Sequence, residues 1–229
     1  LHVDWDVKTA QKGGFKHYMM KEMHEEPIAL KDTLSPGIIE ENGFMRLRDD
    51  QMPLESDYIK NIKRIFFVAC GTAYHCGLVG KNIIEKQLRI PVIADIASEF
   101  RYRDPIIGPE DLVIVISQSG ETADTIAAMK LAQSRGAKVL AICNVVGSTI
   151  AREADFVCYT WAGPEISVCS TKAYVSQLMM TYILILDIAR KRGIFDDARI
   201  SAALKELSAL PEKNRELFEH KEKIQQFAS

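Results

Sequence analysis

A chain of 229 residues is long enough to form one large α/β domain or two small domains. Hydrophobic residues make up 47% of it and charged residues 26%, a balance typical of a globular protein with a substantial core. The formal net charge of -2 argues against nucleic-acid binding, which favours a basic excess, and no apolar run approaches the roughly 20 residues that cross a membrane.

The N-terminal part of the chain is expected to be mainly helical. Residues 14–26 carry apolar side chains at helical spacing. Pro27 is expected to open a second helical stretch, because proline is tolerated in the first turn of a helix. A Pro-Gly pair at residues 36–37 ends that stretch. The polar segment 46–53 predicts a loop, which leads into a short helix near Tyr58.

Five short apolar runs then alternate with helical patterns. We expect strands at residues 65–69, 92–97, 112–116, 138–143 and 156–159. Uninterrupted apolar runs are typical of strands that are buried on both faces of a sheet. Strands that alternate with helices indicate βαβ units and therefore a parallel sheet. The prediction is an α/β fold of three layers, α/β/α, with a five-stranded parallel sheet in the order 2-1-3-4-5 and extra N- and C-terminal helices.

From Thr171 onward the pattern is helical throughout. A shorter helix is expected over residues 198–209, and another is expected to follow Pro211. No repeat or low-complexity linker divides the sequence, so one domain with helical extensions is the simplest organisation. We expect residues 1–60 to form a helical lead-in that packs on the domain, and residues 61–229 to form the domain with its C-terminal helices.

The predicted strand order locates a candidate site. Open parallel sheets bind ligands beyond the carboxyl ends of their strands, beside the switch in strand order. That switch lies between the first and third strands, which are followed by residues 70–73 (CGTA) and 117–122 (SQSGET). Each loop opens a helix, whose free N–H groups and positive dipole end attract an anion.

The second of these loops could hold a phosphate group without a lysine or an arginine. The expected donors are the hydroxyls of Ser117, Ser119 and Thr122 and the amide of Gln118, at roughly 1.5–3 kcal/mol for each charge-assisted bond. Gly120 would let the backbone come close to the ligand. The alternative is that these hydroxyls only cap the helix. Nucleotide motifs match poorly, because no G-x-G-x-x-G follows the first strand.

Other candidates carry weaker signals. His75 could move a proton, but a packed or solvent-facing histidine is the simpler interpretation. The charged segment 99–103 is expected to form ion pairs at a surface or interface, with substrate contact as the alternative. The methionines within residues 19–23 are most simply explained as core packing.

The turn at residues 162–172 is rich in small residues and precedes a helix that starts at Ser170 or Thr171. Lys172 lies in the first turn of that helix, where a positive charge opposes the helix dipole. We therefore expect Lys172 to have an anionic partner, which is either Glu165 or a ligand.

The cysteines and the N-terminus bear on the compartment. The cysteines are Cys70, Cys76, Cys143, Cys158 and Cys169. Their spacing lacks the paired C-x-x-C or histidine pattern of a zinc site, so we expect buried reduced thiols, no metal and no cofactor. Residues 1–6 lack the basic start and apolar core of a signal peptide. The prediction is a cytoplasmic protein.

Several segments together resemble one known family. They are 69–72 (ACGT), 117–125 (SQSGETADT), 162–174 (AGPEISVCSTKAY), 12–23 (KGGFKHYMMKEM) and 97–103 (ASEFRYR). Nearly the whole chain is similar to the isomerase part of the glucosamine-6-phosphate synthases, also called glutamine–fructose-6-phosphate aminotransferases. Within that part, it resembles the first of two sugar-phosphate-binding (SIS) domains.

The resemblance implies that this chain binds fructose 6-phosphate, glucose 6-phosphate or glucosamine 6-phosphate. The implied substrate-binding residues are Thr72, Ser117, Gln118, Ser119, Thr122 and Val168, of which Thr72 and the backbone near Val168 would contact the sugar. Further positions that could contact the ligand are Cys70, Gly71, Ala73, Gly120, Ser170 and Lys172. Ala73 departs from the family, which usually has a serine there, so one phosphate hydroxyl is missing. Cys169 stands where the family often has alanine.

The resemblance also implies domains outside this sequence. A glutaminase domain would precede Leu1, and a second SIS domain would supply the catalytic residues, so we expect no catalytic residue here and an inactive chain on its own. The whole enzyme would be an isomerizing aminotransferase that makes glucosamine 6-phosphate, and we expect a homodimer. Two alternatives stay open: a stand-alone SIS sensor or regulator, and a related deglycase with two SIS domains.

Overall fold

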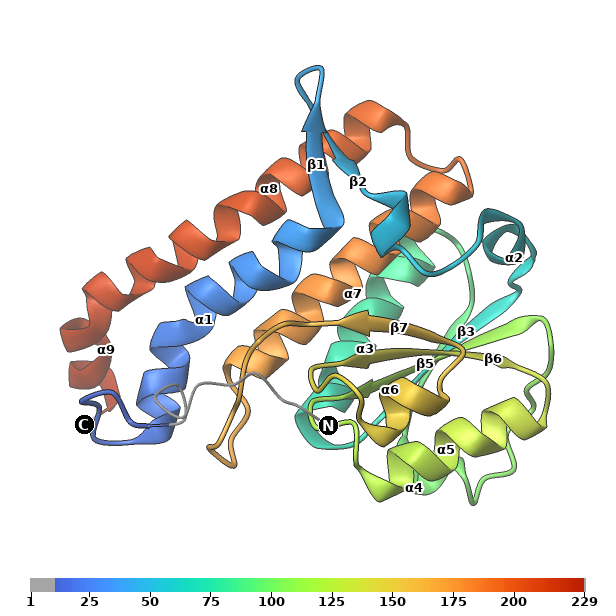
Figure 1. Ribbon diagram of the computed structural model, residues 1–229, viewed down its shortest axis with the longest axis horizontal. Coiled ribbons are helices and arrows are strands. Elements are labelled where there is room, and N and C mark those ends of the chain that lie inside the picture. Colours follow the sequence, from blue (N-terminus) through green and yellow to red (C-terminus); the bar gives the residue numbers. More distant parts are fainter. Residues whose placement is uncertain (1–10, 229) are drawn as a thin grey trace.

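The computed structural model describes residues 11–228, and its centre is a five-stranded parallel sheet (Figure 1). The strands are β3 (Arg64–Ala69), β4 (Val92–Ile96), β5 (Asp111–Ser117), β6 (Lys138–Cys143) and β7 (Phe156–Tyr159). Their spatial order is β4-β3-β5-β6-β7, so β3 and β5 lie side by side although β4 separates them in the sequence. The predicted fold class and the order 2-1-3-4-5 are confirmed.

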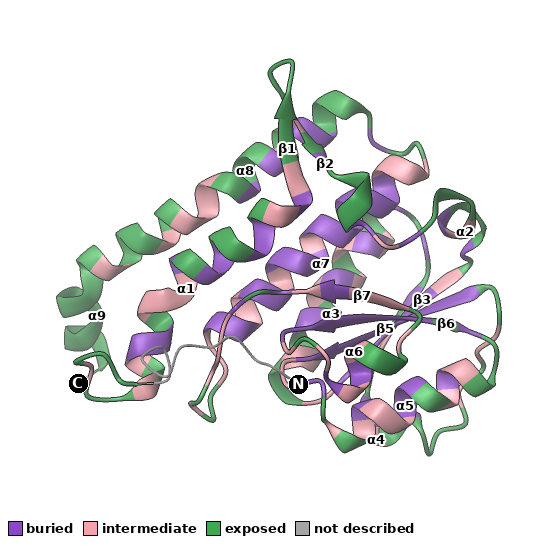
Figure 2. Cartoon of the chain, viewed as in Figure 1, coloured by how far each residue is buried: buried purple, intermediate pink, exposed green. Residues whose placement is uncertain are grey.

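Helices cover both faces of this sheet (Figure 1). One face carries α3 (Gly71–Gln87) and α7 (Lys172–Lys191), and the other carries α4 (Ala97–Phe100), α5 (Ala123–Ser134) and α6 (Thr149–Glu153). Side chains alternate between two cores, so Ile114 packs on the α3 and α7 side whereas Val113 and Val115 pack on the other. All of β5 is buried (Figure 2), which explains its uninterrupted apolar sequence.

The remaining helices form a layer beyond α7. Helix α1 (Tyr18–Leu34) packs against both α7 and α8 (Asp197–Glu216), and α9 (Lys221–Ala228) follows α8 (Figure 1). The short helix α2 (Ser56–Asn61) precedes β3, as predicted, and single 3₁₀ turns lie at Ser35–Gly37, Asp49–Gln51 and Leu217–His220. Much of α8 and all of α9 face solvent (Figure 2). The N-terminal helix α1 packs on α7 and α8.

Pro27 and Pro211 lie inside continuous helices, contrary to the prediction that each begins a new one. An interior proline removes one backbone hydrogen bond and costs about 3 kcal/mol. The packed face of α1 nevertheless continues beyond Pro27, where Leu30 and Leu34 are buried. Burial of such side chains contributes roughly 1.5–3 kcal/mol each, which offsets the lost bond. On α8 the buried side chains all precede Pro211, and beyond it Asn214 donates to Glu26 on α1 at 3.0 Å.

An antiparallel hairpin that was not predicted lies between α1 and the expected loop of residues 46–53, and overlaps that loop only at its first two residues. It pairs β1 (Ile38–Glu41) with β2 (Phe44–Leu47). Asn42 and Gly43 have φ angles of 52° and 78°, and a type I′ hairpin turn requires positive φ at both positions. The Asn-Gly pair is therefore a sequence signal that the prediction missed. The N–H of Met45 donates to Ser201 Oγ at 3.0 Å, which ties the hairpin to α8.

Candidate functional site

A cavity of about 340 Å³ lies at the carboxyl ends of β3 and β5. The two strands pair in register up to Ala69 and Ile116, so the loops that follow them emerge together. The candidate residues that line the cavity are Thr72, Ser117, Gln118, Ser119, Thr122, Val168, Cys70, Gly71, Ala73 and Ser170. Gly120 and Lys172 are candidates that do not line it. The structure thus brings the two predicted loops and part of segment 162–171 around one space.

The loop 117–122 is held by hydrogen bonds among its own residues. The N–H of Gly120 donates to Ser117 Oγ at 3.0 Å, and Ser117 Oγ lies 3.1 Å from Thr122 Oγ1. The N–H of Glu121 donates to Ser119 Oγ at 3.2 Å. These bonds orient the hydroxyls before any ligand arrives, so little side-chain freedom is lost on binding.

Gly120 has a structural role in this loop. Its φ is 67°, in the left-handed region that favours glycine. A Cβ atom at this position would lie 2.0 Å from Ser148 Oγ and 2.8 Å from Cys143 Sγ. The Gly120 carbonyl also accepts the N–H of Ile150 at 3.0 Å. Gly120 therefore packs the loop against the start of α6.

Glu121 makes the second connection between this loop and α6. One of its carboxylate oxygens accepts the N–H of Thr149, in the first turn of α6, at 2.8 Å. This backbone hydrogen bond and a second one from the Thr149 side chain hold the pKa of Glu121 below its ordinary value. Glu121 is thus committed to the neighbouring helix and does not line the cavity.

Two helix N-termini meet at the cavity. Cys70 is the N-cap of α3 and Thr122 is the N-cap of α5, and both residues line the cavity. Neither side chain accepts a capping hydrogen bond from the described residues 11–228. First-turn N–H groups and the positive ends of two helix dipoles therefore favour a negative charge here, by about 0.3–1 kcal/mol per helix. This arrangement suits an anion.

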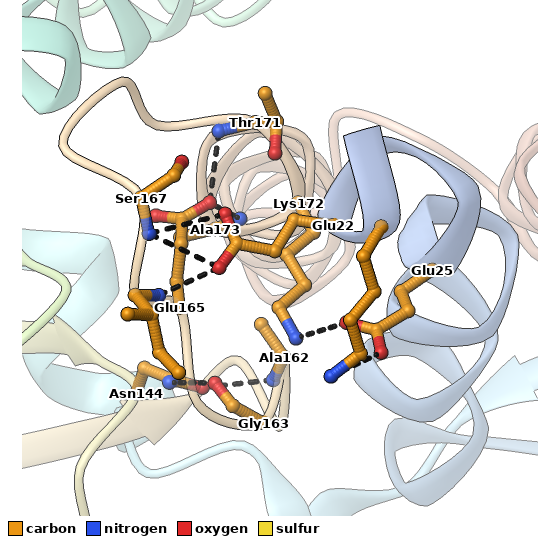
Figure 3. Close-up of polar contacts among 12 residues, drawn as sticks. Glu22, Glu25, Asn144, Ala162, Gly163, Glu165, Ser167, Thr171, Lys172 and Ala173 are labelled. Atoms are coloured by element: carbon orange, nitrogen blue, oxygen red, sulfur yellow. Dashed lines mark hydrogen bonds and ion pairs between the residues drawn. The ribbon is translucent and has the colours of Figure 1, made fainter. Parts of the chain in front are cut away.

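Segment 162–171 forms the remaining wall and is organised by Glu165 (Figure 3). The carboxylate of Glu165 accepts the N–H groups of Thr171 at 2.8 Å and Ala173 at 3.1 Å, and the hydroxyl of Ser170 at 3.0 Å. A carboxylate at this position satisfies free N–H groups of the first turn of α7 and interacts favourably with its dipole. Glu165 lines the cavity, but its oxygens are already engaged.

Glu22 on α1 also supports this wall, a role that no sequence pattern predicted. Its carboxylate accepts the N–H groups of Ile166 at 2.7 Å and Ser167 at 3.1 Å (Figure 3). Burial by itself would raise the pKa of Glu22, but hydrogen bonds from Ser167 and Ile166 outweigh it and hold the pKa below the ordinary 4.5. The wall therefore depends on a carboxylate from the N-terminal helix.

Asn144 is a further supporting residue that the sequence analysis missed. It lies directly after β6, and its side-chain oxygen accepts the N–H of Ala162 at 2.8 Å. Its amide group donates to the carbonyl of Gly163 at 2.7 Å (Figure 3). A buried amide that donates and accepts in this way fixes the path of the chain beyond β7.

Lys172 pairs with a carboxylate that was not among its predicted partners. Its ammonium group lies 2.7 Å from Glu25 Oε2 on α1, and its side chain is 3% exposed (Figure 3). Glu165 instead binds the backbone of α7, as described above. The expectation of an anionic partner is met, but that partner is Glu25 and not Glu165. Lys172 fastens α7 to α1 and lies outside the cavity lining.

The weaker candidates lie away from the cavity. His75 on α3 is exposed and packs against Tyr74. Arg103 pairs with Asp95 at 2.9 Å, and Arg101 lies 3.7 Å from Asp124, in agreement with the predicted ion pairs of segment 99–103. None of these residues lines the cavity among the described residues.

A second, larger groove of about 500 Å³ lies between α1 and the C-terminal helices. It is lined by Met19, Met20 and Met23 together with Leu217 and Ile224. Met19 and Met23 are about 40% exposed, so the prediction of core packing for them was wrong. An apolar lining of this kind cannot replace the hydration of a phosphate group.

The cysteine thiols are free in the structure, and most are buried. Burial raises the pKa of Cys76 to about 11 and that of Cys158 to about 12, whereas Cys169 is exposed beside Val168. In residues 11–228, no group of three or more His, Cys, Asp or Glu side chains is arranged to hold a metal ion. None of the described helices is both long and apolar enough to cross a membrane.

The chain is similar in sequence and in structure to proteins of one known family. A profile of the SIS domain matches residues 58–187. The chain is 53% identical over 229 residues to a glutamine–fructose-6-phosphate aminotransferase (isomerizing) from Caldanaerobacter subterraneus, covering 100% of this chain and 37% of that protein. A protein of the same name from Clostridium acetobutylicum is 51% identical over 228 residues, again covering 100% of this chain and 37% of the relative.

A solved structure gives the same relationship. The C-terminal domain of glucosamine-fructose-6-phosphate aminotransferase from Francisella tularensis aligns with a TM-score of 0.87 at 36% identity, covering 95% of this chain and 60% of that one. The predicted resemblance is thus confirmed along the whole sequence, although the chain spans only 37% of the length of its curated relatives. The profile match runs from α2 into α7 and includes the complete parallel sheet and both cavity loops. This chain belongs to the SIS domain family.

Proposed function

We propose that this chain is the first SIS domain of a glutamine–fructose-6-phosphate aminotransferase and that its cavity binds fructose 6-phosphate. Glucose 6-phosphate and glucosamine 6-phosphate are further ligands of the same cavity. The observation that carries this proposal is the convergence of loop hydroxyls and two helix N-termini on one space. A stand-alone sensor or a deglycase has less support, because the relatives that match the whole chain are named aminotransferases.

The phosphate is held by loop 117–122 in this proposal. Ser119 Oγ accepts the N–H of Glu121 and keeps its own proton, which it can donate to a phosphate oxygen. Ser117 and Thr122 share one hydrogen bond, so their pair retains a further proton for the ligand. Each charge-assisted bond contributes roughly 1.5–3 kcal/mol. The first-turn N–H groups of α3 and α5 complete the anion site.

This phosphate site is uncharged. No lysine or arginine is present among the described residues that line the cavity, and the one carboxylate, Glu165, is bound to the backbone of α7. A dianion held by neutral donors gains less from Coulomb attraction than one held by arginine. Substrate and product can therefore leave between turnovers.

The sugar is expected to lie toward Thr72 and Val168, with Cys70, Gly71, Ala73 and Ser170 close by. Val168 is fully exposed at the tip of segment 162–171, so its backbone is available to a ligand. Thr72 is exposed in the first turn of α3 and offers both a hydroxyl and a free N–H group. These groups can bind sugar hydroxyls, which both donate and accept.

The chemistry of the whole enzyme would come from other domains. The described cavity lining pairs no free acid with a free base, so proton transfer between sugar carbons requires groups from the second SIS domain. A glutaminase domain would supply ammonia, which would condense with the carbonyl of the open-chain ketose to form an imine with loss of water. A 1,2-proton shift would then convert that imine into the aldose amine. We further propose that the enzyme works as a homodimer in the cytoplasm, where free thiols such as these persist.

Calorimetric titration of the 229-residue chain tests the binding proposal. Fructose 6-phosphate and glucose 6-phosphate should bind, inorganic phosphate should bind more weakly, and neutral glucose should not bind. Ser119→Ala should weaken sugar-phosphate binding by about 1–3 kcal/mol while leaving the melting temperature nearly unchanged. Absence of binding at millimolar sugar phosphate, or equal binding of glucose, would contradict the proposal. A collapse of melting in Ser119→Ala would show that this serine chiefly stabilises the loop.

A further inference from the structure

Gln177 is a buried amide at the cavity that the fold itself does not use. It lies in the second turn of α7, is 3% exposed, and is one of the residues that line the cavity. Its side-chain oxygen and nitrogen form no hydrogen bond with any described residue from 11 to 228. These two atoms are not among the fully enclosed unpaired side-chain atoms of the described residues, so they remain open to the cavity. A polar group that the fold leaves unpaired at a cavity is available to a ligand.

The neighbours of Gln177 on α7 make this observation sharper. Thr181, one turn further along, donates to the Gln177 carbonyl at 2.8 Å and lies 3.2 Å from Cys76 Sγ on α3. Thr181, which lies in the contact between α3 and α7, thus has its hydrogen-bond partners within the protein. Ser176 is also buried, and its hydroxyl lacks a partner among the described residues, but it does not line the cavity. Gln177 combines burial, a missing partner and a position on the ligand cavity.

We propose that Gln177 is a sugar-binding residue, whose amide donates to one oxygen of the hexose and accepts from a hydroxyl of it. This inference rests on the proposed function and adds a contact on the sugar to it. An amide is matched to hydroxyl groups, because both can donate and accept, whereas a phosphate dianion can only accept. Gln177 belongs to α7, while the phosphate donors belong to the loop that follows β5. The cavity would thus bind the phosphate of the ligand through the loop after β5 and its sugar through α7.

A buried amide that a ligand satisfies also provides selectivity. An analogue that lacks the matching hydroxyl would leave the amide unpaired in the complex and would be rejected strongly. The site therefore prefers a polyhydroxylated sugar phosphate to a phosphorylated ligand with an apolar body. Free inorganic phosphate would leave Gln177 as it is in the unliganded protein.

The test replaces the amide by an apolar side chain of similar length, Gln177→Met, in the 229-residue chain. The melting temperature without ligand should stay nearly the same, because the fold makes no hydrogen bond to this side-chain amide. Affinity for fructose 6-phosphate should fall about tenfold, and affinity for inorganic phosphate should not change. Ser176→Ala is the matched control, since it also removes a buried unpartnered group from α7, and it should leave both affinities unchanged.

The outcomes separate this inference from the proposed function. If Gln177→Met binds fructose 6-phosphate as tightly as the wild type does, the inference is overturned. The proposed function still stands in that case, because the wild-type chain binds the ligand. An equal loss for fructose 6-phosphate and inorganic phosphate would also overturn it, by placing Gln177 at the phosphate. A lower melting temperature in both Gln177→Met and Gln177→Leu would assign the residue a structural role instead. Wild-type protein that binds neither ligand would refute the proposed function, and this inference with it.

Discussion

Loop 117–122 and segment 162–171 line the same cavity, but they are held in place in different ways. The bonds within the first loop join residues that are close in the sequence, such as Ser117 and Thr122. Segment 162–171 is held not only by its own Glu165 but also by Glu22 and by the pairing of Lys172 with Glu25, and these last two carboxylates come from α1. The phosphate side is thus specified locally, whereas the other side depends on how α1 packs against α7. Substitutions should distinguish the two.

The largest effect is expected when the locally built loop loses its glycine. Gly120→Ala places a Cβ against Ser148 and Cys143 and forces a left-handed φ on alanine, so the free energy of unfolding should fall by about 3–5 kcal/mol. Urea unfolding measures this loss. Gly43→Ala is the control, because its φ is also positive but a Cβ there would meet no atom within 4 Å. Equal losses for the two variants would mean that packing against α6 is unimportant.

A smaller but more selective effect is expected on the other wall. Glu22→Ala leaves the N–H groups of Ile166 and Ser167 without their acceptor, which should lower the free energy of unfolding by about 2–3 kcal/mol. Affinity for fructose 6-phosphate should fall more than affinity for inorganic phosphate. Asp32→Ala, an exposed acidic position on the same helix, is the control. A parallel loss of both affinities would show that the two sides are not independent.

The same carboxylate gives this wall a dependence on pH. The folded pKa of Glu22 lies below its ordinary value of 4.5, so its contribution is complete above about pH 4.5 and is lost as the pH falls through the folded pKa. Glu26 has the opposite shift because burial raises its pKa, so its contribution is lost as the pH rises. The stability difference between wild type and Glu22→Ala should therefore shrink in acid. A constant difference down to about pH 3 would argue against this role.

The smallest expected effect concerns Ala73, where the resemblance to the synthases implies a serine. Ala73 lines the cavity in the first turn of α3, so Ala73→Ser adds one donor to a phosphate already bound by neutral groups. The gain is at most about 1.5–3 kcal/mol, and it is smaller if a water already bridges this position. Binding of glucose 6-phosphate should tighten several-fold, while neutral glucose should be unaffected. A similar change for both sugars would place residue 73 away from the phosphate.

The parallel sheet could be predicted because its strands are buried on both faces and therefore read as apolar runs, as in β5. The two cavity loops followed from the strand order alone. The prolines misled the prediction, since α1 and α8 both continue past them, and on α1 the packed face continues as well. Neither apolar runs nor the strand order could identify the supporting polar residues, which are Asn144, Gln177, Glu22 and Glu25. Isolated amides and acids have no sequence pattern, and their roles depend on contacts between distant segments.

The hydrogen bond between Glu22 and segment 162–171 joins residues far apart in the sequence, and this separation has a consequence for biosynthesis. The bond from Ile166 to Glu22 joins residues 144 positions apart. At a synthesis rate of about 5–20 residues per second, Glu22 leaves the ribosome roughly 7–30 seconds before its acceptor role can begin. Contacts of such high sequence separation also tend to form late, because they close a long loop. Loop 117–122 can thus be in place on a nascent chain before segment 162–171, which helix α1 will hold, has been synthesised.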